Sequence, residues 1–259
     1  MEDILVRVQR AGSTAIVTID RQEVLNALDS ALLDEIDRTF ATLADDRALR
    51  AVVLTGAGKA FVAGADIRAM ADLSVDEALA FARRGQAVFG RVASFPRPVL
   101  AAVNGFALGG GCELALACDL RIGSDRAKLG QPEVGLGVPP GFGGTQRLAR
   151  LVGPSVAKHL LFTGETVDAA RALSLGLLDE IVPAENLLPR CLEIAASVAS
   201  KGPAAVAACK QAVDRGLETS LYEGLCIEAR LFAAAFESAE QKEGMAAFLE
   251  KRPARFAEE

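Results

Sequence analysis

The stretch Leu108-Gly109-Gly110-Gly111-Cys112-Glu113-Leu114-Ala115-Leu116-Ala117 is the part of the chain that decides the fold. A run of β-forming residues at 99–103 precedes its three glycines, and the apolar residues after them are typical of a short helix. A second β-forming run, residues 120–124, follows at once. Strands that alternate with helices predict an α/β fold.

The same alternation continues on both sides of this stretch. Residues 4–8 and 15–20 predict a hairpin, residues 50–55 a buried strand and residues 75–92 a helix. A further helix is predicted to begin at Asp29 or Ser30, because Leu32, Ile36 and Phe40 recur at helical spacing after them. After residue 145 the pattern is mostly helical, with one short strand expected at 178–182.

From residue 201 onward only helices are expected. We therefore predict a core over residues 1–200 and a helical region over residues 201–259. The segment 221–250 is apolar on more than one side, so it cannot bury its surface on itself. We expect it to pack on the core or on another subunit, and we expect an oligomer.

Composition limits the partners and the compartment. The chain has 259 residues, of which 51% are hydrophobic, which is enough for a sizeable core. The net charge is −6 and no Lys- and Arg-rich run is interleaved with aromatics, so neither nucleic acid nor a membrane is an expected partner. No apolar stretch reaches the roughly 20 residues that span a bilayer. Five cysteines without CxxC spacing, and no leader-like start, favour the cytoplasm.

Several common catalytic motifs are missing or fail. The single histidine, His159, lies in a segment that predicts an amphipathic helix, which argues against Ser-His, Cys-His and most zinc chemistry. Gly56-Ala57-Gly58-Lys59-Ala60 lacks the first glycine and the hydroxyl of a phosphate loop. Gly141-Phe142-Gly143-Gly144-Thr145-Gln146 has glutamine where a dinucleotide-binding turn needs glycine. We therefore expect no metal.

Two glutamates are the best candidates for chemistry. Glu113 and Glu133 each lie among glycines and apolar residues. Burial raises the pKa of a carboxyl from about 4.3 toward neutrality, where one group can give a proton and another can take one. The pair predicts a proton-transfer enzyme. Two simpler interpretations remain open: Glu113 could cap its own helix, and Glu133, after Pro132, could lie in an exposed turn.

Two glycine turns predict an anion site made from the main chain. Ala63-Gly64-Ala65-Asp66-Ile67 and the glycines at 109–111 each follow an expected strand and lead into a helix, which leaves N–H groups unpaired. Two such groups that converge on one oxygen form an oxyanion hole, and one donor is worth about 3 to 4 kcal/mol of barrier. Alternatively, the glycines could only allow close packing, and Asp66 could only cap a helix.

These segments occur in a familiar order. The order is Leu25-Asn26-Ala27-Leu28, residues 61–67, 98–105 and 109–113, Gly130-Gln131-Pro132-Glu133, residues 140–148 and residues 243–248. Together they resemble the enoyl-CoA hydratase/isomerase (crotonase) superfamily over nearly the whole chain. The resemblance implies a spiral of repeated ββα units, a C-terminal helical region used in assembly, and trimers that pair into hexamers. It also implies acyl-CoA thioester substrates and no cofactor, since coenzyme A is part of the substrate.

The resemblance assigns roles to individual residues. It implies that the N–H groups of Ala65 and Gly110 hold the thioester oxygen. Glu113 would orient and activate a water for attack on Cβ, Glu133 would exchange a proton at Cα, and Gly141 would shape the water pocket.

It further implies a set of residues that contact coenzyme A. Val24, Ala63, Asp66 and Ile67 would line the CoA or acyl path, and Phe232 and Lys251 would reach the CoA of a neighbouring subunit. Lys251, in a charged stretch, could instead be a solvated surface residue.

The two glutamates also separate the possible reactions. Isomerases of the superfamily often keep only the acid at position 133, so both acids together predict reversible hydration of 2-trans-enoyl-CoA. The alternatives are a Δ3,Δ2-enoyl-CoA isomerase or another acyl-CoA lyase of the family. An RNA-binding relative is disfavoured, because the chain is acidic and has no lysine-rich helix. Phe142 stands where many relatives have alanine, which leaves the preferred acyl length open.

Overall fold

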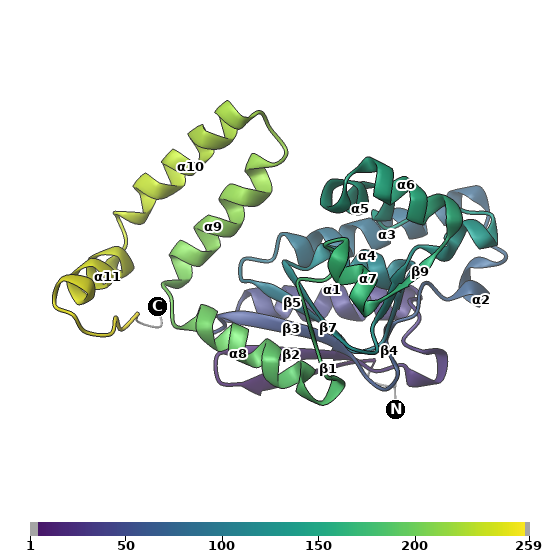
Figure 1. The fold of residues 1–259 in the computed structure, drawn as a ribbon, viewed down its shortest axis with the longest axis horizontal. Coiled ribbons are helices and arrows are strands. Elements are labelled where there is room, and N and C mark those ends of the chain that lie inside the picture. Colours follow the sequence, from purple (N-terminus) through teal and green to yellow (C-terminus); the bar gives the residue numbers. More distant parts are fainter. Residues whose placement is uncertain (1–4, 257–259) are drawn as a thin grey trace.

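The computed structural model describes residues 5–256 and places one large sheet at the centre of the molecule (Figure 1). Within those residues the sheet has six strands in the order β1-β2-β3-β5-β7-β10. Their bounds are β1 Val6–Ala11, β2 Thr14–Ile19, β3 Ala51–Gly56, β5 Val99–Val103, β7 Leu120–Ser124 and β10 Glu180–Val182. β1 and β2 form the predicted antiparallel hairpin, and the other neighbours are parallel. All five residues of β5 are buried, as is usual for a parallel strand covered on both faces.

A second sheet lies beside the first and was not predicted. It contains β4 (Ala60–Val62), β6 (Phe106–Leu108), β8 (Lys128–Gly130) and β9 (Thr166–Asp168) in that order. β4, β6 and β8 each come directly after a strand of the large sheet, and each leads on to helical turns. The chain therefore repeats a strand, strand, helix unit, which confirms the expected spiral of ββα units.

Helices cover both faces of the large sheet. The helices of the body are α1 Ser30–Ala44, α2 Ile67–Met70, α3 Val75–Ala93, α4 Gly110–Ala117, α5 Gly144–Val152, α6 Pro154–Thr163, α7 Ala169–Ser174 and α8 Leu187–Ala199. Short 3₁₀ turns are η1 Gln22–Val24, η2 Pro132–Leu136 and η3 Ala184–Asn186. α1 begins after an Asp29 N-cap as predicted, and all of α4 is buried. α1, α3 and α4 pack on one face of the large sheet, and α8 packs Leu187, Cys191 and Ala195 on the other face.

The C-terminal helices extend away from this body, on the left in Figure 1. They are α9 Pro203–Gly216, α10 Leu221–Ala235 and α11 Ala239–Leu249, which confirms that residues beyond 201 are helical. α9 and α10 pack closely where Gly216 and Gly224 face each other, with no buried residue in either helix. An ion pair between Lys210 and Asp119 (2.8 Å) ties α9 to the body. Within residues 5–256 no helix is both long and apolar enough to cross a membrane.

Candidate active site

Glu113 lies in the first turn of α4 and its side chain is buried in the protein. The chain can turn from β6 into α4 because Gly109 takes φ +50°, which side chains with a Cβ rarely adopt. Glu113 is only 1% exposed. Its Oε1 accepts hydrogen bonds from the backbone N–H groups of Phe142 (2.8 Å) and Gly144 (2.6 Å). The carboxylate thus binds the turn before α5 and not the first turn of its own helix, so self-capping does not explain it.

Glu133 lies in η2, close to the same glycine. A Cβ placed on Gly109 would lie 2.9 Å from Oε1 of Glu133. Gly109 also donates to the carbonyl of Gly130 (2.9 Å), and Glu113 donates its N–H to the carbonyl of Gly109 (2.9 Å). Gly109 therefore brings together two acids that are twenty residues apart, and Glu133 faces this junction from a half-buried position.

Both carboxyls have raised pKa values. Desolvation is the largest cause at Glu113, opposed by the hydrogen bonds from Gly144 and Phe142. At Glu133 desolvation, with a smaller contribution from the charge of Glu113, raises the pKa to about 7. A carboxyl with such a pKa can exchange a proton near neutral pH.

Gln131 also belongs to this cluster, although the sequence argument gave it no role. It is buried, and with its amide turned to satisfy its neighbours it donates to Glu133 Oε1 (3.0 Å) and Oε2 (3.3 Å). The end of its side chain also lies against Gly144, the residue that donates to Glu113. The only signal in the sequence was a polar residue beside Pro132 and Glu133.

The two expected oxyanion-hole residues lie on neighbouring segments. Ala65 forms an isolated parallel bridge with Leu28, and a Cβ on Gly110 would lie 2.9 Å from Cδ1 of Leu28. Gly110 is the first residue of α4, where N–H groups lack helical acceptors. Among the turn, loop and cap hydrogen bonds of residues 5–256, neither Ala65 nor Gly110 donates its N–H. Both residues therefore lie beside Leu28, and that their N–H groups hold one oxygen stays a prediction.

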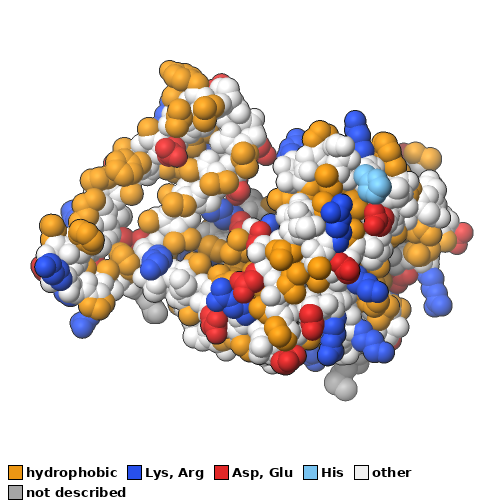
Figure 2. Space-filling view, in the orientation of Figure 1, with side chains coloured by type: hydrophobic (Ala, Val, Ile, Leu, Met, Phe, Trp, Pro, Cys, Tyr) orange, Lys and Arg blue, Asp and Glu red, His pale blue; other side chains and the backbone are white. Residues whose placement is uncertain are grey.

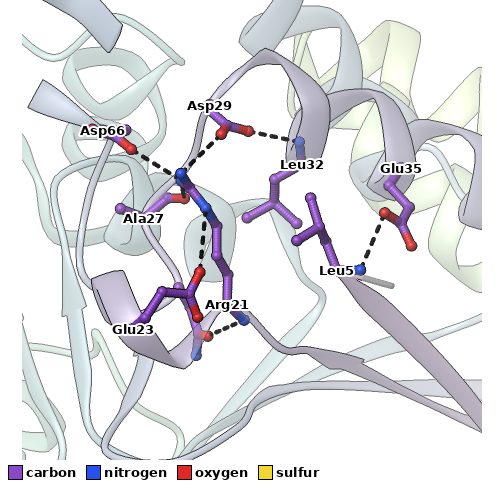
Figure 3. A network of polar contacts seen from close by, with 9 residues as sticks. Leu5, Arg21, Glu23, Ala27, Asp29, Leu32, Glu35 and Asp66 are labelled. Carbon is purple, nitrogen blue, oxygen red and sulfur yellow. Dashed lines mark hydrogen bonds and ion pairs between the residues drawn. The ribbon is translucent and has the colours of Figure 1, made fainter. Parts of the chain in front are cut away.

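Asp66 is a helix cap and one arm of a charged network (Figure 3). Its Oδ1 accepts from the backbone N–H of Arg68 (3.0 Å), which caps α2, and its Oδ2 accepts from Arg21 (3.0 Å). The capping interpretation of Asp66 is therefore correct. Both carboxylate oxygens already have partners within the chain.

Gly141 and Phe142 lie in the turn before α5 that binds Glu113. The carbonyl of Gly141 accepts from the side chain of Gln86 (2.9 Å). The Phe142 ring is buried and contacts Phe81 and Phe89 edge to face, at centroid distances of 5.2 and 5.5 Å. This packing fixes the peptide N–H of Phe142 that donates to Glu113.

The residues expected along the CoA path fall into two groups. Val24 ends η1, Ala63 donates to the carbonyl of Leu25 (3.1 Å), and the exposed Ile67 starts α2, so all three lie beside Ala65 in the fold. Phe232, which is 67% exposed, lies on α10, and Lys251 follows α11. These two belong to the arm that extends from the body, so the structure of one chain does not bring them to the acids (Figure 1).

Two other side chains that could be reactive are Cys112, next to Glu113 in α4, and His159. Desolvation raises the pKa of the Cys112 thiol to about 12, so this residue is a buried apolar contact and not a nucleophile. His159 is exposed on α6 and contacts Glu165 (3.1 Å). No group of three or more potential metal-ligating side chains occurs in the part of the chain that the structure describes.

Comparisons with known proteins agree on one family. The sequence model described as enoyl-CoA hydratase/isomerase matches residues 9–259. The chain is 49% identical to the crotonyl-CoA hydratase of Syntrophomonas wolfei over 96% of both chains, and 47% identical to the short-chain-enoyl-CoA hydratase of Clostridium acetobutylicum over 95% of both. The crystal structure of an enoyl-CoA hydratase from Bacillus anthracis superposes with a TM-score of 0.95 at 38% identity, covering 99% of this chain and all of the other. The chain therefore belongs to the enoyl-CoA hydratase/isomerase family.

Proposed function

We propose that this protein catalyses the reversible hydration of 2-trans-enoyl-CoA thioesters to 3-hydroxyacyl-CoA. One observation carries the proposal: a buried carboxylate, Glu113, lies across Gly109 from Glu133, whose pKa of about 7 suits proton exchange. The relatives named as crotonyl-CoA and short-chain-enoyl-CoA hydratases support it. An isomerase needs only one carboxylate to move a proton along the acyl chain, so the second acid favours hydration.

The main chain stabilises the charge that develops in this reaction. The thioester oxygen lies between the N–H groups of Ala65 and Gly110. As the water oxygen bonds to Cβ, the electron pair of the C=C bond moves toward Cα and the carbonyl, and negative charge grows on that oxygen. Fixed donors aimed there stabilise the transition state by about 3 to 4 kcal/mol each.

Each of the two glutamates transfers one proton in the hydration. Glu113, with Oε1 held by two amides, accepts a proton from the water through its other oxygen while the hydroxyl adds to Cβ. Protonated Glu133 gives its proton to Cα. One water is consumed, and the proton that Glu113 gained returns to Glu133 before the next turnover.

The remaining residues bind and shape the substrate. Val24, Ala63 and Ile67 line the CoA path, and Asp66 contributes through its backbone, since its carboxylate is held by Arg21 and Arg68. Gly141, held by Gln86, shapes the water pocket. Coenzyme A is part of the substrate, and no other cofactor takes part.

The proposed assembly completes the site. Phe232 and Lys251 reach the CoA bound to a neighbouring subunit of a homotrimer, and two trimers form a hexamer. The exposed position of Phe232, on an arm away from its own body, supports this arrangement.

The decisive experiment removes each acid in turn. Glu113→Gln and Glu133→Gln should each lower kcat for crotonyl-CoA hydration by about 10²- to 10⁴-fold, because each loses a positioned proton-transfer group. Glu165→Gln, at an exposed acid on the protein surface, is the control. A near-normal rate in either site variant would rule out this mechanism. An assay of 3-enoyl-CoA beside crotonyl-CoA separates isomerisation from hydration.

A further inference from the structure

A charged network next to the proposed oxyanion hole has no part in the mechanism above. The Arg21 guanidinium donates to the carbonyl of Ala27 (2.9 Å), to Asp66 Oδ2 (3.0 Å) and to Asp29 Oδ2 (3.1 Å), as Figure 3 shows. The three charged side chains are only 14 to 22% exposed. Arg21 also pairs with the exposed Glu23 at 3.8 Å, and its other three contacts lie in a partly desolvated place, where the forked guanidinium holds geometry that an ammonium cannot.

Each of the two aspartates holds the start of a helix. Asp29 Oδ1 accepts from the N–H of Leu32 (2.8 Å) and caps α1, while Asp66 Oδ1 accepts from the N–H of Arg68 (3.0 Å) and caps α2. One guanidinium therefore joins the N-termini of two helices that are 37 positions apart in the chain, α1 starting at Ser30 and α2 at Ile67.

Ala65 lies between these two anchored ends. Leu28 donates to the carbonyl of Gly64 (2.8 Å) and accepts from the N–H of Asp66 (2.7 Å), so the peptide of Ala65 is framed by both bonds. Gly64, just before it, has φ +128°, and a glycine leaves the direction of the next N–H weakly determined. The direction of the Ala65 N–H therefore depends on the two hydrogen bonds with Leu28, and on the contacts that hold Leu28 and Asp66 in place.

We infer that Arg21 is a positioning residue for the oxyanion hole: through Asp66 and Ala27 it fixes the two bridged segments that aim the Ala65 N–H at the thioester oxygen. This inference rests on the proposed function. Arg21 does not touch the substrate in this scheme. Its loss weakens polarisation of the carbonyl, which is a transition-state interaction, and so lowers kcat more than it changes KM.

The first test separates polarisation from binding. In Arg21→Met, kcat for crotonyl-CoA should fall about 10- to 100-fold with KM within about threefold, and Arg21→Lys should recover only part of the loss. A cinnamoyl-CoA with a para-dimethylamino group reports polarisation directly, because its absorption moves to longer wavelength when a hydrogen bond draws charge to the carbonyl. The shift should be large in the wild type and mostly lost in Arg21→Met.

The matched control is a second buried arginine. Arg121 donates to the carbonyl of Cys118 (3.0 Å) and pairs with Asp179 (3.2 Å), so Arg121→Met also removes a buried guanidinium from a carboxylate and a carbonyl. It should keep both the wavelength shift and kcat in the folded protein. If Arg121→Met loses them to the same extent as Arg21→Met, the effect is general destabilisation and the inference is wrong.

A double-mutant cycle tests the route through Asp66. Asp66→Asn can still cap α2 but loses its charge, and Arg21→Met/Asp66→Asn should be no slower than the slower single variant by more than about twofold. If the losses in kcat of the two single variants multiply in the double variant, or if Arg21→Met keeps the wavelength shift, the inference is wrong. The proposed function would still stand. A wild type that neither hydrates crotonyl-CoA nor shifts the chromophore would overturn the proposed function, and this inference with it.

Discussion

Glu133 shows how position sets the chemistry of a single residue. Its carboxyl is partly desolvated beside Gly109 and near the charge of Glu113, so its pKa rises to about 7 from the ordinary 4.5. The folded protein therefore keeps this proton at pH values where the unfolded chain has lost it. The contribution of Glu133 to stability is full below about pH 4.5 and is lost as the pH rises through about 7.

This sign leads to a stability prediction for Glu133→Gln. The variant removes the ionisation, so its free energy of unfolding relative to the wild type should rise by about 2 kcal/mol between pH 5 and pH 8, after allowing for partial exposure of the side chain. Urea unfolding at four pH values measures it, with Glu185→Gln, at an exposed acid far from the single histidine in the sequence, as the control. A pH-independent difference would show that the carboxyl of Glu133 is not desolvated.

The sequence predicted the two acids but not the residues that hold them. Glu113 and Glu133 were identified because an acid among glycines and apolar residues is unusual. Gln131 and Arg21 are ordinary polar residues in the sequence, and their roles depend on partners such as Gly144 and Asp66. Contacts of that kind are set by tertiary packing, which no local pattern contains.

At the scale of elements, the predictions succeeded where the element was long. β5, β7 and the start of α3 were predicted to the residue, and α1 was found from its apolar spacing and its cap. The second sheet was missed because β4, β6, β8 and β9 have three residues each, too few to show an alternation. The strand expected at 178–182 begins only at Glu180, since Leu178 is buried in the turn after α7.

Helix α3 offers a prediction about how one element supports the site. It contains two glycines, of which Gly85 is buried against the Phe142 ring and Gly90 has no atom within 4 Å of an added Cβ. Gly85→Ala would overlap that ring and displace the N–H that donates to Glu113. It should lower the free energy of unfolding by about 1 to 3 kcal/mol and also reduce kcat for crotonyl-CoA.

Gly90→Ala on the same helix is the matched control. Alanine in open space within a helix should stabilise the fold by about 0.5 to 1 kcal/mol and leave kcat unchanged. Both variants are measured by urea unfolding and by crotonyl-CoA hydration. If Gly85→Ala matches Gly90→Ala in both measurements, α3 does not hold the turn that binds Glu113.

At the scale of the whole molecule, the C-terminal arm, which consists of α9, α10 and α11, leaves apolar surface exposed. Apolar side chains run along α10 and α11 in Figure 2, and Leu221, Leu225, Phe232, Phe248 and Leu249 are all more than half exposed. An exposed apolar surface of this kind is typical of an interface. The sequence predicted the helices, and their packing on another subunit stays a prediction, while the direction of the arm, away from its own body, required the structure.

This direction predicts that active sites are shared between subunits. Glu113→Gln lacks a catalytic acid, and Phe232→Ala/Lys251→Ala lacks the proposed CoA contacts, so each variant alone should be nearly inactive at low substrate concentration. When the two are coexpressed with different tags and purified through both, a chain with intact Glu113 can receive Phe232 and Lys251 from its neighbour. In a trimer that carries both tags, one of its three sites combines an intact Glu113 with an intact neighbouring arm, so about a third of the sites are complete. Light scattering verifies that both variants still assemble.

The mixed assembly could also show only the activity of the two parent variants. That result would mean that each chain supplies its own CoA contacts, because no chain in the mixture carries both an intact acid and an intact arm.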